Sequence, residues 1–317
     1  MNPTRIIIDT DPGVDDALAF LLALASPEIQ LEALTTTHGN VTVEKATRNA
    51  LSVLELARAP YIPVAQGSMF PLVQTLLRAD GFVHGASGIG NAQLPKPRAK
   101  PILQHAVDYL IERALAEPNQ MSIFPIGPLT NIAMAIRKQP ELIKIVKELV
   151  IMGGAIQEGG NITPLAEFNI FADPHAAHIV FHSGIPITLI PLDATHKCLL
   201  GQKHLDRLNK INSPITRFIS EAVGVYLESS LKLGYQGSAM HDPLTLATIL
   251  APELLTLKEY YVDVDISGGV SMGKTFADFY HVTQKPTNMK VALDVRGEEF
   301  IELFLQRMES LSRSIPD

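Results

Sequence analysis

The stretch RIIIDTDPGVDDALAF, residues 5–20, decides the fold of this chain. Its three consecutive isoleucines are typical of a buried β-strand, because β-branched side chains pack well on a pleated surface. From Asp15 onward the apolar residues have helical spacing, and Asp15 and Asp16 fall in the first turn, where the helix dipole favours anions. A strand that leads through a short loop into a helix predicts a parallel sheet flanked by helices.

The same alternation of strands and helices continues outward from this stretch. The predicted strands are Arg5–Asp9, Leu31–Thr37, Ile62–Ala65, Met121–Ile126, Glu148–Met152, Ile187–Leu192, Tyr260–Ile266 and Met289–Val295. The predicted helices are Asp15–Ala25, Val43–Ala57, Leu129–Arg137, Pro174–His182, Ser213–Leu233, Asp242–Leu250 and Glu298–Leu311.

No internal repeat or linker rich in Pro, Gly and Ser interrupts this pattern. We therefore expect one α/β domain over residues 1–317, with a mainly parallel central sheet flanked by helices. Ligands of open α/β sheets bind beyond the carboxyl ends of the strands, so we expect the active site there.

The composition excludes several functional classes. A charged fraction of 19% and a formal net charge of −7 provide no basic surface for a nucleic-acid backbone, so no nucleic-acid polymer is expected as a partner. The longest apolar run, Ala17–Ala25, has about half of the roughly 20 residues that cross a bilayer, which argues against a membrane protein. The single cysteine, Cys198, and the lack of an N-terminal targeting pattern favour a cytoplasmic protein.

Four aspartates follow the first predicted strand within eight residues: Asp9, Asp11, Asp15 and Asp16. Like charges this close repel one another unless a cation, shared protons or hydrogen-bond donors compensate them, so the cluster predicts a hard divalent metal ion. A purely structural explanation is that one of these carboxylates caps the following helix.

Two other kinds of site begin in a similar way. A calcium EF-hand loop is excluded, because it needs glycine at its sixth position, and counting from Asp9 places Gly13 fifth. A phosphatase that works through an aspartyl phosphate also starts with Asp-x-Asp after an apolar strand, with Asp9 as the nucleophile beside magnesium. That enzyme stays open as an alternative, although Pro12-Gly13 and a second acidic pair follow at once.

The segment from Asp9 to Ala17 resembles the N-terminal signature of the inosine–uridine-preferring nucleoside hydrolases. Further segments resemble blocks of that family in the right order, and the nearest subgroup is the bacterial ribonucleoside hydrolases of broad base preference. These segments are Gly39-Asn40, Val83-His84-Gly85, Ile126-Gly127-Pro128-Leu129-Thr130-Asn131, Val150-Ile151-Met152-Gly153-Gly154, Glu167-Phe168-Asn169, Ala172-Asp173-Pro174 and His241-Asp242-Pro243.

The resemblance implies a calcium-dependent hydrolase that cuts the N-glycosidic bond of purine or pyrimidine ribonucleosides. It assigns the Ca²⁺ ligands to Asp11, Asp16, Asp242 and the backbone carbonyl of Ile126, a set of oxygen donors that suits Ca²⁺. It also implies that Asp11 takes a proton from the metal-bound water, and that the enzyme is a homodimer or homotetramer.

The resemblance assigns ribose binding to five residues: Asp15, Asn40, Asn161, Glu167 and Asn169. Glu167 and Asn169 stand two apart, so on extended backbone they would face the same way. His84 lies in a loop similar to one that folds over the site, in which Ala86 departs from the acidic residue of many relatives. Tyr235, beside Gln236, is expected to stack on the base or to be exposed to solvent.

His241 precedes the expected ligand Asp242 and is expected to protonate the departing base, although it could merely support the following helix. A third hypothesis is a non-catalytic, calcium-dependent nucleoside-binding protein. Such a protein has no use for a general base and acid, yet Asp11 and His241 both stand at the family positions. Release of free base and ribose without phosphate separates the three hypotheses.

Overall fold

The computed structural model describes residues 2–76, 84–232 and 234–315. An eight-stranded sheet in the order β3-β2-β1-β4-β5-β6-β12-β9 forms its centre. The strands are β1 (Thr4–Thr10), β2 (Ile29–Thr36), β3 (Val64–Gln66), β4 (Ser122–Pro125), β5 (Glu148–Met152), β6 (Ile187–Ile190), β9 (Leu255–Tyr260) and β12 (Met289–Val295). Neighbours in this sheet are parallel except β12 and β9. The expected α/β fold with a mainly parallel sheet is confirmed.

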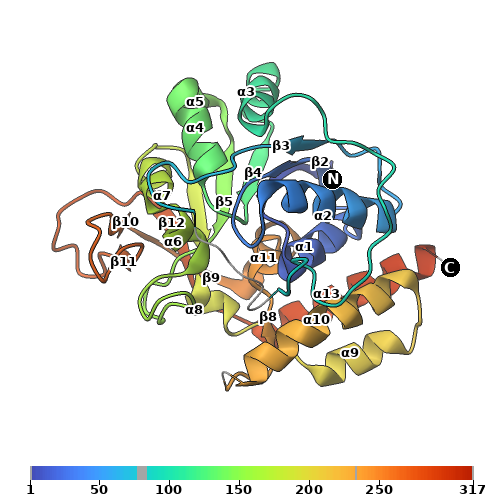
Figure 1. The fold of residues 1–317 in the computed structure, drawn as a ribbon. Helices are drawn as coiled ribbons and strands as arrows, with labels where there is room; N and C mark the ends of the chain where they lie inside the picture. The colour runs from blue at the N-terminus through green and yellow to red at the C-terminus, as the bar shows by residue number, and fades with distance from the viewer. Residues whose placement is uncertain (1, 77–83, 233, 316–317) are drawn as a thin grey trace.

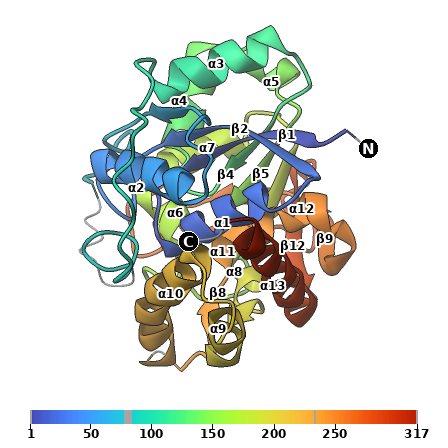
Figure 2. The same cartoon turned by 90° about the vertical axis from the view of Figure 1, so that its right-hand side faces the viewer.

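Helices cover both faces of this sheet, as Figures 1 and 2 show. Ile6 and Ile8 point to one face, into a core shared with α1 (Val14–Leu24), α2 (Val43–Leu56), α10 (Pro214–Lys232) and α13 (Gly297–Ser314). Ile7 points to the other face, into a core shared with α3 (Ala106–Ala116), α4 (Thr130–Lys138) and α7 (Pro174–Phe181). The two-residue period of a strand therefore explains why all three isoleucines are buried.

The remaining elements are short or lie outside the main sheet. They are α5 (Leu142–Ile145), α6 (Phe168–Ala172), α8 (Leu192–Thr195), α9 (Gln202–Asn209), α11 (His241–Thr245), α12 (Ala247–Leu250), the 3₁₀ turn η1 (Pro252–Leu254), the pair β7 (Leu199–Leu200) and β8 (Ser238–Ala239), and the pair β10 (Val262–Val264) and β11 (Thr275–Ala277). Within the described residues, no helix combines the length and the apolar character needed to cross a membrane.

Several predicted elements need correction. Tyr260–Ile266 is not one strand, because Tyr260 ends β9 beside Met289 while Val262–Val264 leaves the sheet and pairs with β11. The predicted helix Asp242–Leu250 is two short helices, which meet at Leu246. The helices that were not predicted are α3, α5, α6, α8 and α9, and the strands that were not predicted are β7, β8, β9 and β11. Leu233, the predicted end of α10, lies outside the described residues.

Candidate active site

The carboxyl ends of β1, β4 and β5 lie side by side at one edge of the sheet. Asp9 at the end of β1 pairs in register with Pro125 of β4, and β4 pairs with β5. Helix α11 packs against α1 and β5, which brings Asp242 to the loop after β1 (Figure 1). Segments far apart in the sequence therefore meet where ligands of open α/β sheets bind.

Asp15, Asp16 and Asp242 form a tight group of buried carboxylates. One oxygen of each lies within 4.8 Å of the others. Burial raises the pKa of Asp15 to about 7, and burial together with the charge of Asp15 raises that of Asp16 to about 6. Burial and the surrounding carboxylates raise the pKa of Asp242 well above its ordinary value. A bound cation relieves this mutual repulsion.

Asp11 is fully buried beside this group. Its Oδ2 accepts a hydrogen bond from the backbone N–H of Asn40 (2.6 Å), while its Oδ1 has no hydrogen-bond partner among the described residues. Burial and the charge of Asp16 raise its pKa well above the ordinary value. A Cβ atom at Gly127 would lie 2.6 Å from Oδ1, so only glycine lets the backbone pass this close to the carboxylate.

Asp16 also stabilises the start of α1. Thr10 Oγ1 donates to its Oδ1, and its Oδ2 accepts from the backbone N–H of Gly13 (2.8 Å) and from Asn40 Nδ2 (3.4 Å). The capping explanation therefore applies to Asp16. It does not account for Asp15, whose Oδ1, like Oδ1 of Asp11, is buried and unpartnered within the described residues.

The donor set at this edge fits a hard divalent cation. An unpartnered buried carboxylate oxygen is costly, and Asp9, Asp11 and Asp15 each have one among the described residues, which points to a positive charge that these residues do not supply. Carboxylate and carbonyl oxygens suit Ca²⁺ or Mg²⁺ rather than zinc. The tight group contains Asp15 in place of Asp11, so the ligand set that includes Asp11 stays a prediction.

Asn169 lies beside the backbone carbonyl that is expected to bind the metal. Its Nδ2 donates to the carbonyl oxygen of Ile126 (2.8 Å) and to that of Met152 (3.3 Å). Because a carbonyl oxygen has two lone pairs, Ile126 keeps one for a cation.

Glu167 has a structural role that the sequence did not reveal. Its Oε1 accepts from the N–H of Asn169 (2.9 Å), and its Oε2 accepts from the N–H groups of Gly154 (2.9 Å) and Ile170 (3.1 Å). It therefore caps α6 and ties that helix to the loop after β5. The extended backbone expected around Glu167 and Asn169 is wrong, because α6 already begins at Phe168.

Asn161 lies in the loop before α6. It is exposed, and its Oδ1 accepts from the N–H of Phe168 (2.9 Å). Asn161 thus fixes the start of the same helix that Glu167 caps.

His84 packs against the start of α1. Its Nδ1 accepts from the N–H of Val14 (3.2 Å) and lies 3.9 Å from Asp15 Oδ1. Burial lowers the pKa of His84 to about 4, so the ring is neutral at pH 7. Val83, from the same motif, lies outside the described residues.

His241 forms a pair with Thr195 of α8. Its Nδ1 lies 2.8 Å from Thr195 Oγ1. Burial, followed by the neighbouring His196 and His84, lowers the pKa of His241 to about 3, so its imidazole is neutral at pH 7.

Three residues near the site carried no signal in the sequence: His196, Thr195 and Tyr226. The ring of His196 lies 5.7 Å from that of His241 and 5.1 Å from that of Tyr235, which is 39% exposed. Tyr226 of α10 packs on His84 at 5.5 Å, and burial, then the charges of Asp15 and Asp242, raises its pKa. An aromatic residue on an amphipathic helix has the same pattern as a core residue, so sequence alone does not separate them.

Asp9 does not behave like a nucleophile. Its Oδ1 accepts from Thr35 Oγ1 (2.5 Å) and Asn131 Nδ2 (2.8 Å), while its Oδ2 has no hydrogen-bond partner among the described residues. Asn131 in turn accepts from the backbone and side chain of Ser68, so Asp9 joins a structural network. This position argues against the phosphatase alternative, which needs Asp9 to reach the substrate.

Comparison with known proteins identifies the family of this chain. The profile of the inosine-uridine preferring nucleoside hydrolase family matches residues 6–302. The chain is 41% identical over 306 residues to the pyrimidine-specific ribonucleoside hydrolase RihA of Salmonella gallinarum, covering 96% of this chain and 98% of that protein.

Solved structures show the same similarity. The purine-preferring ribonucleoside hydrolase from Gardnerella vaginalis superposes with a TM-score of 0.92 at 34% identity, covering 98% of this chain and 99% of that one. The plant nucleoside hydrolase PpNRh1 superposes with a TM-score of 0.90 at 36% identity, covering 96% and 99%. With a family match over nearly its whole length and buried carboxylates at the edge of the sheet, the chain belongs to the inosine-uridine preferring nucleoside hydrolases.

Proposed function

We propose that this chain hydrolyses the N-glycosidic bond of ribonucleosides to free base and ribose, with Ca²⁺ as its metal ion. The carrying observation is the group of buried carboxylates at the sheet edge, with unpartnered oxygens on Asp11 and Asp15, in a chain of this family.

Four groups are proposed to hold the cation: the carboxylates of Asp11, Asp16 and Asp242 and the carbonyl of Ile126. Their burial and mutual repulsion in the protein alone support this set, because each carboxylate gains from a nearby positive charge. When bound, Ca²⁺ would orient the ribose hydroxyls and make a water molecule more acidic.

Asp11 is proposed as the general base. Asn40 fixes one of its oxygens, and the other has no protein partner in the described part of the chain, so a lone pair is available for the proton of the attacking water. Gly127 leaves room for this carboxylate, since a Cβ atom there would lie 2.6 Å from Oδ1.

His241 is proposed as the proton donor to the departing base. When Thr195 donates its hydroxyl hydrogen to Nδ1, the single ring proton of the neutral imidazole stands on Nε2. That nitrogen can then donate to the base nitrogen as the C–N bond breaks. Because the pKa of His241 is lowered, its ring is neutral at pH 7. The proposed proton donor is therefore the neutral imidazole and not an imidazolium.

The sugar is proposed to bind among Asp15, Asn40, Asn161, Glu167 and Asn169, with His84 and Tyr235 toward the base. The unpartnered Oδ1 of Asp15 is the clearest support, because it can accept a hydroxyl hydrogen. Asn161 and Glu167 already accept backbone N–H groups, so their contribution includes shaping α6.

The names of the similar proteins indicate different base preferences. RihA of Salmonella gallinarum is named as pyrimidine-specific, and the Gardnerella vaginalis enzyme as purine-preferring. The first experiment is therefore an assay of free base released from inosine, adenosine, guanosine, uridine, cytidine and xanthosine, with the 5′-monophosphates alongside. We expect base and ribose from at least one ribonucleoside. Phosphate release without free base, or binding without turnover, would contradict the proposal.

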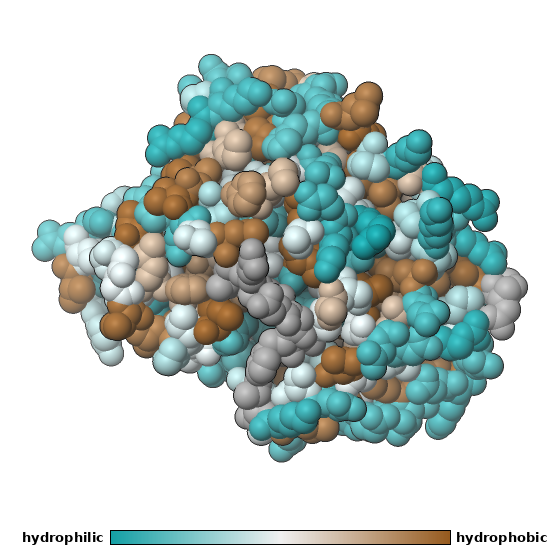
Figure 3. Space-filling view, in the orientation of Figure 1, coloured by the Kyte–Doolittle hydropathy of each residue, from teal (hydrophilic) through white to brown (hydrophobic). Residues whose placement is uncertain are grey.

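The protein is further proposed to be a homodimer or homotetramer. Val270, Phe276, Tyr280 and Val282 are 94%, 44%, 88% and 78% exposed. They lie in or beside the β10–β11 pair, where Figure 3 shows apolar residues on the lobe at the left. Exposed apolar surface of this kind is typical of subunit contacts. We expect Tyr280→Asp to lower the mass measured by light scattering, whereas an unchanged mass would place the contact elsewhere.

A further inference from the structure

His178 in α7 and His182, the residue that ends this helix, face one aspartate of β10. His178 and His182 stand four residues apart, so their side chains lie on the same face of the helix. Helix α7 packs against β10, which carries Asp263. None of the three belongs to the proposed calcium site.

The three side chains lie close enough together to share one metal ion, because one ligand atom of each lies within 4.8 Å of the others. His178 Nδ1 lies 3.3 Å from Asp263 Oδ1, and His182 Nε2 lies 3.6 Å from Asp263 Oδ2. A direct charge-assisted hydrogen bond would be ~2.7–2.9 Å. Two ligands bound tetrahedrally to Zn²⁺ at ~2.0–2.1 Å are separated by about 3.3–3.4 Å, which is close to the spacing found here.

The ring of His182 is oriented as in a metal ligand. Its Nδ1 lies 2.8 Å from the carbonyl oxygen of His178, and since a carbonyl only accepts, Nδ1 carries the proton. In the neutral ring the lone pair is then on Nε2, which faces Asp263. A histidine held at one nitrogen by a carbonyl, with the other turned to the metal, is the usual arrangement of such sites.

The Tyr261 hydroxyl does not satisfy that lone pair. It lies 2.7 Å from Asp263 Oδ2 and 3.2 Å from His182 Nε2, and it has one proton for two acceptors. The shorter contact gives the proton to Asp263. Lys285 Nζ donates to the hydroxyl oxygen at 2.6 Å and fixes this orientation. Nε2 of His182 therefore keeps its lone pair.

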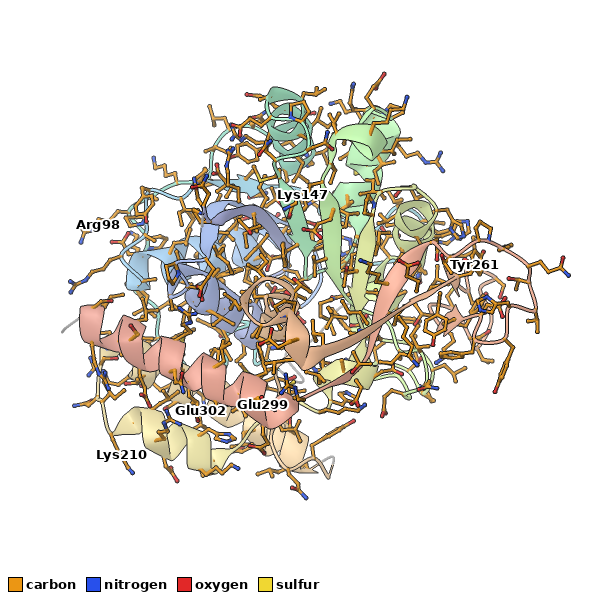
Figure 4. All side chains as sticks on the ribbon, turned by 180° about the vertical axis from the view of Figure 1, so that it is seen from behind. Arg98, Lys147, Lys210, Tyr261, Glu299 and Glu302 are labelled. Carbon is orange, nitrogen blue, oxygen red and sulfur yellow. The ribbon has the colours of Figure 1, made fainter. Side chains whose placement is uncertain are left out.

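The carboxylate of Asp263 is oriented by hydrogen bonds from its neighbours and is partly accessible to solvent. Its Oδ1 accepts from the N–H of Val264 at 2.9 Å, and Tyr261 holds Oδ2. The side chains of His178, His182 and Asp263 are 40%, 33% and 17% exposed, so an ion can enter and keep a water molecule as a further ligand. Figure 4, seen from behind, labels Tyr261 at the end of the molecule that carries β10 and β11.

We propose that His178, His182 and Asp263 form a second metal site, for a divalent transition metal ion such as Zn²⁺. Two imidazole nitrogens and one carboxylate oxygen are a donor set for Zn²⁺, and a poor one for Ca²⁺, which prefers oxygen alone. The bound ion would tie α7 to the β10–β11 pair.

The test titrates Zn²⁺ and Co²⁺ into protein that has been stripped of metals and then saturated with Ca²⁺, so that the carboxylate site is filled. We expect one Zn²⁺ per chain by elemental analysis after gel filtration. We also expect Co²⁺ to produce the visible absorption of a tetrahedral site, and Zn²⁺ to raise Tm in the presence of Ca²⁺.

Variants separate this site from other places where zinc could bind. His182→Ala and Asp263→Ala should each weaken Zn²⁺ binding by more than ~10–100-fold, the usual loss for a residue that only supports a ligand. Tyr261→Phe removes a supporting contact to Asp263, so it should weaken Zn²⁺ binding by ~10–100-fold. All three should hydrolyse nucleosides at the wild-type rate with Ca²⁺, which shows that they fold.

His105→Asn is the matched control. His105 caps α3 through Val107, and asparagine keeps a capping side chain while removing an imidazole from another part of the molecule. Zn²⁺ affinity should not change in this variant. No saturable uptake of Zn²⁺ by the wild type, or equal uptake by His182→Ala, would overturn the proposal.

Discussion

In the proposed mechanism, the contact between His241 Nδ1 and Thr195 Oγ1 leaves Nε2 as the nitrogen that can donate to the leaving base. A neutral imidazole has one donor and one acceptor nitrogen, so when Thr195 donates to Nδ1 the ring proton stands on Nε2. The side chain of Thr195 is therefore as informative about the reaction as the histidine that the motif contains.

His241→Ala should slow inosine hydrolysis by ~10²–10⁴-fold, the usual contribution of a positioned proton donor. It should have much less effect on 4-nitrophenyl riboside, because a phenolate leaves without protonation. The measurement is kcat for both substrates in wild type and variant, with calcium content and folding verified. Equal losses on the two substrates would mean that His241 positions the sugar or the metal instead.

Asp16→Asn should release the calcium ion while leaving α1 capped. The amide oxygen still accepts from the N–H of Gly13, but the ligand charge is lost. We expect Ca²⁺ affinity to fall by more than ~10–100-fold, the loss typical of a residue that only supports a ligand. Elemental analysis and activity against calcium concentration measure this, and excess Ca²⁺ should restore part of the rate. Stoichiometric zinc in this site, or full activity without metal, would refute the assignment.

Sequence motifs predicted the aspartates and His241, because charged residues directly after a strand are a recognisable pattern. The motifs gave no indication of three other residues at the site. These are Thr195 of α8, His196 directly after α8, and Tyr226 of α10. Their roles depend on tertiary contacts between elements far apart in the sequence. Glu167 shows the opposite case, since its motif was evident but its contacts to three backbone N–H groups were not.

The loop after β4 passes close to the carboxylate of the proposed base. Gly127 faces Asp11, and a Cβ there would lie 2.6 Å from Oδ1. The glycine is required by close approach of the backbone to a side chain, not by an unusual turn.

Gly127→Ala should lower kcat on the order of 10²-fold, because a displacement of about 1 Å at a catalytic group has such an effect. Gly224→Ala is the matched control, since Gly224 lies inside α10 and a Cβ there meets nothing within 4 Å. That variant should keep its activity and gain up to about 1 kcal/mol of stability from helix propensity. Unchanged kcat in Gly127→Ala would show that Asp11 can shift freely.

At the scale of elements, the sequence predicted the bounds of two strands of the central sheet because their apolar residues are mostly buried. Glu148–Met152 and Met289–Val295 have the predicted bounds. The predicted strand Tyr260–Ile266 failed where the chain leaves the sheet, since the residues on both sides of Tyr261 are extended and only the partner strand differs. Pairing partners are a property of the fold, which a local pattern does not contain.

At the scale of the whole molecule, the buried carboxylates link stability to pH and to the metal. Burial raises the pKa of Asp9 and Asp15 to about 7, above the ordinary unfolded value of roughly 3.9. The folded, metal-free protein therefore binds more protons than the unfolded chain, so its stability falls as pH rises through the folded pKa. Buried histidines such as His84 have the opposite effect only below roughly pH 6.5, where the unfolded ring takes up protons.

Metal removal should therefore lower Tm more at pH 8 than at pH 6.5. Each carboxylate that ionises in this interval costs on the order of 1 kcal/mol in the metal-free protein, whereas bound Ca²⁺ compensates the charges. Calorimetry of calcium-loaded and metal-free protein at both pH values measures the difference. A difference in Tm between calcium-loaded and metal-free protein that is smaller at pH 8 than at pH 6.5 would contradict the cation site.

The two edge strands of the central sheet, β3 and β9, disfavour self-association into fibrils. Strand β9 is the last strand on one side, and it exposes Thr256, Lys258 and Glu259. On the other side β3 is three residues long, and the segment at Ile102 bonds to its Val64. A charged border strand and a short, partly covered one are poor templates for an added strand from another molecule. The native protein should therefore stay free of edge-to-edge aggregation at high concentration, despite a sheet rich in β-branched residues.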